Sequence, residues 1–261
     1  MAGPTTAERG ERKQVRPGPP RPTRLGRLRT LRMLIILSLA AVLAVGGSLW
    51  LLYGSPWLRV EHVSVSGTRV LTAAQVREAA GVRIGSPLIS VDTEVIEARV
   101  RRKLPRIDTI DAVRSWPHGI GLKVTERTPV LVIKNGGKFV EVDREGVRFA
   151  TVSQAPNGIP ALELTVSKSA GWRRFGTDRM VREAALVAQD VPAGVKRDIR
   201  TVRVRSYDAI SLELTGGRTV LWGSSERGRA KATALTALMK AASGARHFDV
   251  SVPTAPASSG S

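Results

Sequence analysis

Residues 107–129, IDTIDAVRSWPHGIGLKVTERTP, contain two stretches in which apolar and polar side chains alternate. In the second stretch Ile120, Leu122 and Val124 alternate with small or charged residues. Because successive side chains of a strand point to opposite faces, a period of two predicts β-strands with one buried face. The Pro-His-Gly tripeptide between the stretches favours a turn. The segment therefore predicts two consecutive strands of a small folded unit.

Upstream of these strands the sequence predicts a further strand and two helices. An apolar alternation that ends at Gly67 predicts the strand. Thr72 followed three residues later by Gln75 is a capping box that begins the first helix. Asp92 can cap the second helix. The order predicted for residues 57–128 is β-α-α-β-β, with two helices able to cover one face of a three-stranded sheet.

Before this unit lies a long apolar segment, residues 33–53, MLIILSLAAVLAVGGSLWLLY. Its length is close to the roughly 20 residues that cross a hydrocarbon core about 30 Å thick. The alternative is a cleaved secretory signal, but the 32 preceding residues are long for one and LLYGSPWL offers no small-x-small cleavage site. We therefore predict a single transmembrane helix. Three small residues form a face where another helix could pack: Gly46, Gly47 and Ser48.

The formal net charge of +19 is large for 261 residues. Residues 1–32 carry nine Lys or Arg against two Glu, or +7, which leaves +12 for residues 33–261. We predict that residues 1–32 form a disordered basic tail inside the cell, because Arg and Lys beside an apolar segment favour the cytoplasmic side. Nucleic-acid binding is the alternative use of the arginines, but no aromatic residue interleaves them, so orientation and contact with anionic lipid are favoured.

Residues 129–252 predict a second mixed α+β domain built on an antiparallel sheet. Hairpins are indicated by Asn135-Gly136-Gly137 and by Gly216-Gly217, each between alternating apolar stretches. Asp178 and Ser225 can each cap a helix. The last residues, 253–261, PTAPASSGS, have almost no apolar side chains and predict a disordered tail.

Three motifs make the chain resemble a known family. They are V-x-V-x-G (Val63, Val65, Gly67), G-x-P-L-x-x-V-D (Gly85, Pro87, Leu88, Val91, Asp92) and W-P…V-x-E-R-x-P (Trp116, Pro117, Val124, Glu126, Arg127, Pro129). With the β-α-α-β-β order they resemble a POTRA module. Behind a single membrane helix whose N-terminus is inside, residues 33–257 as a whole resemble the FtsQ/DivIB family of bacterial cell division proteins.

The resemblance implies a non-catalytic, bitopic scaffold of the divisome at the division septum. Such a protein binds FtsB- and FtsL-type partners outside the membrane and helps coordinate septal peptidoglycan synthesis. In the family, the C-terminal strand and its neighbouring helix receive a short segment of FtsB. Carried over by matching FDVSVP, the contact comprises Asp249, Val250, Ser251, Val252, Pro253 and Thr254. The alternative, that these residues merely complete a sheet, stays open.

Residues that carry chemistry are scarce. There is no cysteine, and the three histidines stand at no metal-ligand spacing, so we expect no metal and no cofactor. No nucleophile, phosphate-binding or zinc-protease motif occurs, which predicts that the protein is not an enzyme. The sequence leaves open an acid/base pair of carboxylates that the fold brings together. The alternative function is therefore a membrane-tethered cell-wall-binding or cell-wall-modifying protein, in which the positive external surface would bind anionic wall polymers.

Overall fold

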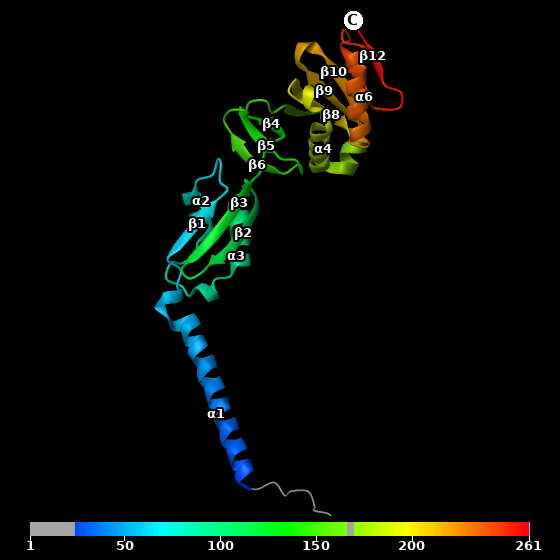
Figure 1. Ribbon diagram of the computed structural model, residues 1–261. Helices are drawn as coiled ribbons and strands as arrows, with labels where there is room; N and C mark the ends of the chain where they lie inside the picture. Colours follow the sequence, from blue (N-terminus) through cyan, green and yellow to red (C-terminus); the bar gives the residue numbers. More distant parts are fainter. Residues whose placement is uncertain (1–23, 166–169, 261) are drawn as a thin grey trace, which may run out of the picture.

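A computed structural model of the chain describes residues 24–165 and 170–260. Figure 1 shows a long helix at one end, a small sheet domain next to it, and a larger sheet domain at the far end. The expected tail, residues 1–32, lies outside the described residues as far as residue 23.

The first described element is a long helix. Helix α1 spans Arg24–Leu49 and passes into a π-helical turn, η1, Trp50–Gly54. Within the described residues, one helix is long and apolar enough to cross a membrane, Leu31–Gly54, with a mean hydropathy of 2.3. The prediction of disorder is wrong for residues 24–32, which are helical. Leu and Arg dominate this stretch and are good helix formers, so the helix extends beyond the apolar segment.

The small domain has the expected β-α-α-β-β order. Its elements are β1 (His62–Ser66), α2 (Ala73–Ala80), α3 (Thr93–Lys103), β2 (Ile107–Ser115) and β3 (Gly119–Glu126), with short helical turns η2 (Pro56–Leu58) and η3 (Leu88–Ser90). The sheet order is β1-β3-β2, with β1 parallel and β2 antiparallel to β3. Thr72 and Gln75 form the predicted capping box, and Asp92 accepts the N–H of Val95.

Local sequence and packing agree in this domain. Val76 and Val100, from the two helices, are fully buried and pack on Ile120 and Leu122 of the central strand. Alternate residues of β3 are thus placed beneath the helices, as the period of two predicted. The result is a small domain with a single apolar core.

In the larger domain, nine strands form one sheet within residues 129–165 and 170–260. They are β4 (Leu131–Asn135), β5 (Lys138–Val142), β6 (Arg148–Val152), β7 (Ala161–Leu164), β8 (Ile199–Ser206), β9 (Ala209–Leu214), β10 (Thr219–Gly223), β11 (His247–Asp249) and β12 (Ala257–Ser259). Their order is β12-β11-β10-β9-β8-β7-β4-β5-β6.

The sheet is mixed, although an antiparallel one was expected. Five of the pairings among its described strands are antiparallel, and three are parallel: β4–β7, β7–β8 and β10–β11. The chain passes through a helix between β7 and β8 and again between β10 and β11. A helical crossover returns the chain to the end of the sheet at which the first strand began, so the two strands run parallel.

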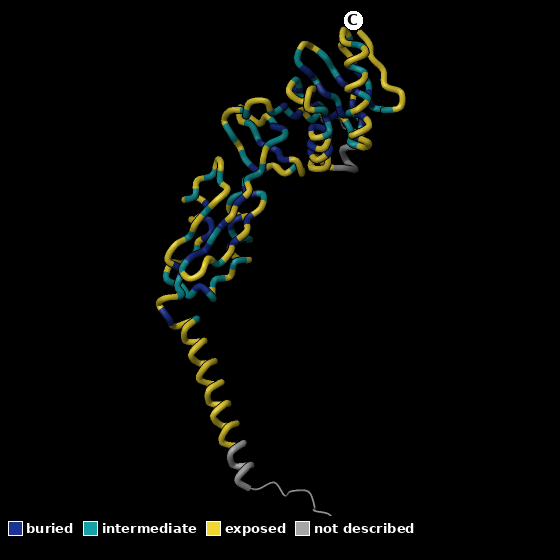
Figure 2. The backbone as a smooth tube through the Cα atoms, in the orientation of Figure 1, coloured by how far each residue is buried: buried dark blue, intermediate teal, exposed yellow. Residues whose placement is uncertain are grey.

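Helices cover one face of this sheet. They are α4 (Ala170–Asp190), which is broken at Gly176, the short α5 (Ala193–Lys196), and α6 (Gly228–Ala241). Trp222, Leu212 and Leu235 are fully buried between the helices and the sheet. Figure 2 shows buried backbone in dark blue inside this domain, whereas residues 31–49 of α1 are exposed. Ser225 is not the expected cap of α6, because its hydroxyl donates to Glu183 and Arg227 occupies the cap position.

Candidate functional site

The predicted partner-binding residues, 249–254, lie where the chain reverses at the C-terminal edge of the large sheet. Strand β11 has β10 on one side and β12 on the other. The prediction of a disordered tail is therefore wrong for Ala257–Ser259, which form the edge strand β12. The reversal is local: Asp249 Oδ1 accepts the N–H of Ser251 at 2.9 Å and its hydroxyl at 2.7 Å. The N–H of Ala255 then donates to the carbonyl of Val252 at 3.0 Å.

The six predicted residues differ in their burial. Asp249 ends β11, and Val250 is buried, with its N–H bonded to the carbonyl of Leu221. Val252 and Thr254 are exposed, whereas Ser251 and Pro253 are half-buried. Residues 250–254 are thus the connection beside the edge, and the edge itself belongs to β12. Sequence reasoning missed Ala257, Ser258 and Ser259, because ASS lacks the apolar alternation that indicates a strand. The two prolines before it, Pro253 and Pro256, favour a turn.

The ladder shows which backbone groups of β12 are free. Thr219 donates its N–H to the carbonyl of Arg246, and Val250 donates to Leu221. These two bonds are made by the residues that flank β11, and they turn its middle residue, Phe248, toward β10. Because backbone groups alternate along a strand, His247 and Asp249 face β12, where Ser259 and Ala257 stand opposite them. Ser258 therefore directs its N–H and C=O outward, as the open position of the edge.

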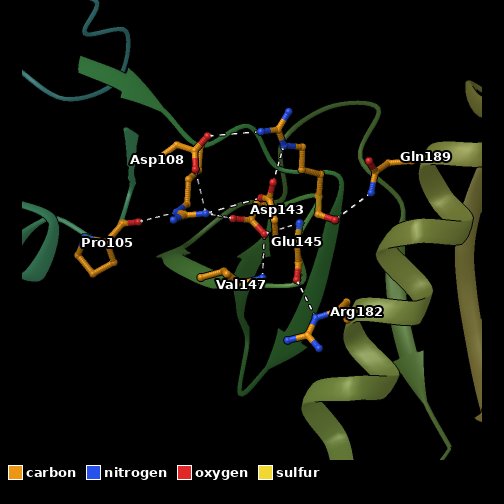
Figure 3. A network of polar contacts seen from close by, with 9 residues as sticks. Pro105, Asp108, Asp143, Glu145, Val147, Arg182 and Gln189 are labelled. Atoms are coloured by element: carbon orange, nitrogen blue, oxygen red, sulfur yellow. Dashed lines mark hydrogen bonds and ion pairs between the residues drawn. The ribbon is translucent and has the colours of Figure 1, made fainter. Parts of the chain in front are cut away.

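A second polar cluster joins the two external domains (Figure 3). Arg127 follows β3 of the small domain, and its guanidinium donates to Asp143, which lies just after β5 of the large domain. The same guanidinium lies 3.3 Å from Asp108 and 3.8 Å from Glu145. The Asp143 side chain is only 2% exposed. Its other oxygen accepts the N–H groups of Glu145 and Val147, so the turn after β5 is shaped around this carboxylate.

Beside this cluster lies a second buried ion pair. Arg106 Nη2 is 2.6 Å from Glu141 Oε2, with the two side chains 14% and 5% exposed. The Arg106 guanidinium also lies over the ring of Phe149, 5.2 Å from its centroid, where a cation is attracted by the π electrons. Both ion pairs reach from the small domain to the large one. They hold the two domains together where the chain passes from β3 to β4.

The E-R-x-P motif has a structural explanation in these contacts. Its arginine, Arg127, crosses to the large domain. Its glutamate, Glu126, accepts the backbone N–H groups of Arg69, Val70 and Leu71 in the loop after β1. Partial burial raises the pKa of Glu126, but these backbone donors outweigh it and hold the pKa below its ordinary value. One dipeptide therefore fixes a loop within one domain and the position of the next domain.

Lys231 is a buried charge in α6. Lys231 is 2% exposed, and its Nζ donates to the carbonyl of Ser224 at 2.7 Å. Burial lowers the pKa of Lys231, which nearby Glu226 only partly offsets. The lysine anchors the start of α6 to the end of β10, next to the strands that lead to the C-terminal edge.

In the membrane helix, Gly46, Gly47 and Ser48 are exposed, and a Cβ atom added at either glycine would meet no atom within 4 Å. Their surface is open to another helix. Among residues 24–165 and 170–260, no group of three or more His, Asp or Glu is arranged to hold a metal ion.

Comparison with known proteins agrees with this architecture. Residues 58–127 match the POTRA domain, FtsQ-type, and residues 131–251 match the C-terminal domain of the cell division protein FtsQ/DivIB. The chain is 70% identical to the cell division protein FtsQ of Streptomyces collinus over 265 aligned positions, which cover 100% of both chains. It is 67% identical to FtsQ of Streptomyces coelicolor, again over 100% of both. It is 59% identical to FtsQ of Streptomyces venezuelae over 86% of this chain and 83% of that one.

Proposed function

The chain belongs to the FtsQ/DivIB family of bacterial cell division proteins, and from this premise we propose that it is a non-catalytic scaffold of the divisome. It spans the cell membrane once, with the N-terminus inside and both sheet domains outside. At the division septum it binds FtsB- and FtsL-type partners and helps coordinate septal peptidoglycan synthesis. The arginines before the apolar helix support this orientation.

The observation that carries the proposal is the open edge at β12. A short edge strand with free N–H and C=O groups accepts an extended segment of another chain as an added strand. Ser258 supplies the outward backbone groups, and the exposed side chains of Val252 and Thr254 lie in the adjoining connection. Backbone bonds would give affinity, and these neighbouring side chains would give specificity. The edge stands at the end of the molecule farthest from helix α1 (Figure 1), where it is accessible to partners.

Substitution at Ser258 tests this edge with a matched control. Ser258→Pro removes an N–H that the fold does not use, and edge strands tolerate proline where the N–H faces solvent. Ser258→Ala keeps the backbone donor. We expect Ser258→Pro to abolish co-purification of the FtsB-type partner from cells, while Ser258→Ala retains it. Equal recovery with both variants, each folded by circular dichroism, would reject strand addition at β12.

Residues Asp249–Thr254 are proposed to contact the same partner from the side of the edge. Photo-crosslinkers placed singly at Val252 and Thr254, both exposed, should trap the partner in living cells. A crosslinker at the buried Val250 serves as the control, since its side chain is inaccessible. If the exposed positions trap nothing while Ser258→Pro still abolishes binding, the contact is confined to β12.

The small face of the membrane helix is proposed to pack against a partner's membrane helix. Replacing Gly46, Gly47 and Ser48 together with Leu fills that face without adding charge. We expect weaker recovery of membrane partners, because close helix approach needs small residues. Unchanged recovery from membranes containing the correctly inserted variant would exclude a role for this face.

Binding of anionic wall polymers is a second proposed activity, compatible with the first. It is supported by the +12 charge of residues 33–261. Sedimentation of the full chain with purified wall material should then weaken with rising salt, because exposed charges are screened. Release of wall fragments during the assay would instead favour a wall-modifying enzyme.

A further inference from the structure

Three segments of the small domain meet at its end next to helix α1. His62 of β1 is opposite Gly119 of β3, which is in turn opposite Ser115 of β2, so the start of β1 and the β2–β3 turn share that end. The loop before η3 is bonded to the same place: Gly85 donates its N–H to the carbonyl of Val60 at 2.7 Å, and Val60 donates to Ser86. Figure 1 shows these turns at the top of the membrane helix.

Each of these three segments exposes one large apolar side chain. Trp57 is 69% exposed, Ile84 in the loop is 63% exposed, and Trp116 in the β2–β3 turn is 50% exposed. Arg83, adjacent to Ile84, is exposed as well. Single exposed apolar residues are ordinary on a protein surface. Two tryptophans and an isoleucine that converge from three segments on one end are a composed surface, which we call the membrane-facing end.

The connection to the helix is short and held in place. Trp57 follows Gly54, the last residue of η1, by three residues, which is at most about 11 Å of extended chain. Ser55 is buried, and its hydroxyl accepts the N–H of Trp57 at 3.1 Å. Arg59 donates to the carbonyl of Gly85 at 2.9 Å, and η1 contacts η3. The domain is therefore seated on the end of the helix and not suspended from a flexible linker.

This geometry identifies what covers the exposed side chains. The headgroup layer extends about 5–8 Å beyond each side of the hydrocarbon core, and the apolar span ends at Gly54. A domain seated directly on that end places its lower turns within the layer. Tryptophan is the side chain most suited to it, because the ring is apolar and its N–H can bond to headgroups. An exposed arginine beside such rings matches lipid phosphates.

We propose that the membrane-facing end, with Trp57, Ile84 and Trp116, is a lipid-docking surface that inserts among the headgroups of the outer leaflet. Docking sets the height and the direction of the external domains above the membrane. It presents the β12 edge at a defined distance from the bilayer. The inference is independent of which protein binds that edge, but it requires that α1 spans a membrane.

The absence of cysteine from the chain allows a direct test with single nitroxide labels. The full chain is placed in vesicles of phosphatidylcholine and phosphatidylglycerol, with a label at Ile84→Cys or Trp116→Cys. Collisions of the label with oxygen and with a water-soluble nickel complex then report its depth. Val70→Cys is the matched control, because Val70 is 67% exposed but lies at the opposite end of β1. Leu43→Cys, in the middle of the span, tests the insertion of α1 separately.

If the proposal is right, the labels at 84 and 116 collide more with oxygen and less with the nickel complex than the label at 70. The label at 70 should show the collision rates of a label in water. Labels at 84 and 116 that match position 70 overturn it. So does shielding from both reagents, which would indicate burial against another protein chain. An aqueous reading at 43 would reject the membrane span itself, and with it the proposed function. A further variant, Trp57→Glu with Ile84→Glu, should lose the lipid reading at 116 while circular dichroism remains unchanged.

Discussion

Replacing Glu141 with glutamine should loosen the junction between the two external domains. Glu141 of the large domain and Arg106 of the small domain form an ion pair of 2.6 Å. Glutamine keeps the size of the side chain and one acceptor oxygen but removes the negative charge. The Arg106 guanidinium then stays over the ring of Phe149 without its ion-pair partner. The substitution therefore tests whether this pair holds the domains together.

The expected size follows from the burial of the two side chains. Removing one partner of a buried ion pair costs about 3–5 kcal/mol, mainly because the remaining charge is buried alone. Arg106 is 14% exposed and Glu141 5%, and glutamine still accepts one hydrogen bond. We therefore expect the lower end, about 3 kcal/mol, which is roughly a hundredfold in the docking equilibrium. A matched control is Glu163→Gln, whose pair with Arg203 is more exposed, at 54% and 31%, and should cost less than about 1 kcal/mol.

Two measurements separate docking from folding. Urea unfolding of the full chain in micelles gives the loss of stability. Spin labels at Lys103→Cys and Lys138→Cys, one exposed position in each domain, give the distribution of distances between the domains. We expect one narrow distribution in the parent chain and a broadened one with Glu141→Gln. If Glu141→Gln costs no more than Glu163→Gln and leaves the distribution narrow, the ion pair does not fix the domains.

Three further predictions concern single residues. Glu126→Gln should lower the free energy of unfolding by about 1.5 kcal/mol at neutral pH, because the backbone N–H groups then bond to a neutral side chain. The folded pKa of Glu126 lies below its ordinary 4.5. In urea unfolding, the parent chain alone should therefore lose this contribution as the pH falls through the folded pKa. Lys231 has a folded pKa below its ordinary 10.5, so the unfolded chain binds more protons and stability should rise with pH between the two values; Lys231→Met should abolish that rise. Gly67→Ala should cost about 3 kcal/mol, because φ is +88° and the new Cβ would lie 2.0 Å from the carbonyl of Val124. Gly136→Ala, with φ +55° and no atom within 4 Å, should cost only about 1–2 kcal/mol in thermal unfolding.

The spacing of residue types along the sequence was sufficient to predict the local elements. The alternation around Ile120 and Leu122 predicted β3, and the capping box at Thr72 predicted the start of α2; both are confirmed. It was also sufficient for the apolar helix, because length and the lack of charge are read directly along the chain. Strand periodicity, capping and hydropathy depend on neighbours within a few residues, so they can be predicted from the sequence alone.

At the C-terminal edge of the large sheet, prediction from local sequence patterns was wrong. Residues 257–259 carry no apolar pattern, and they become a strand only because β11 offers them a ladder partner. The edge of the sheet is therefore β12, with Ser258, and not the predicted residues 249–254. The predicted cap of α6 was wrong for a similar reason, because the Ser225 hydroxyl donates to Glu183 on another helix and does not cap α6.

The sequence by itself determined the membrane helix, the two-domain order and the strands and caps of the small domain, because each depends on residues that are close along the chain. The tertiary structure alone decided which distant residues meet. Arg106 and Glu141 are 35 positions apart and form the junction between domains. Trp57, Ile84 and Trp116 come from three segments and form one end. Such pairings depend on strand order and chain reversal, which no local spacing encodes.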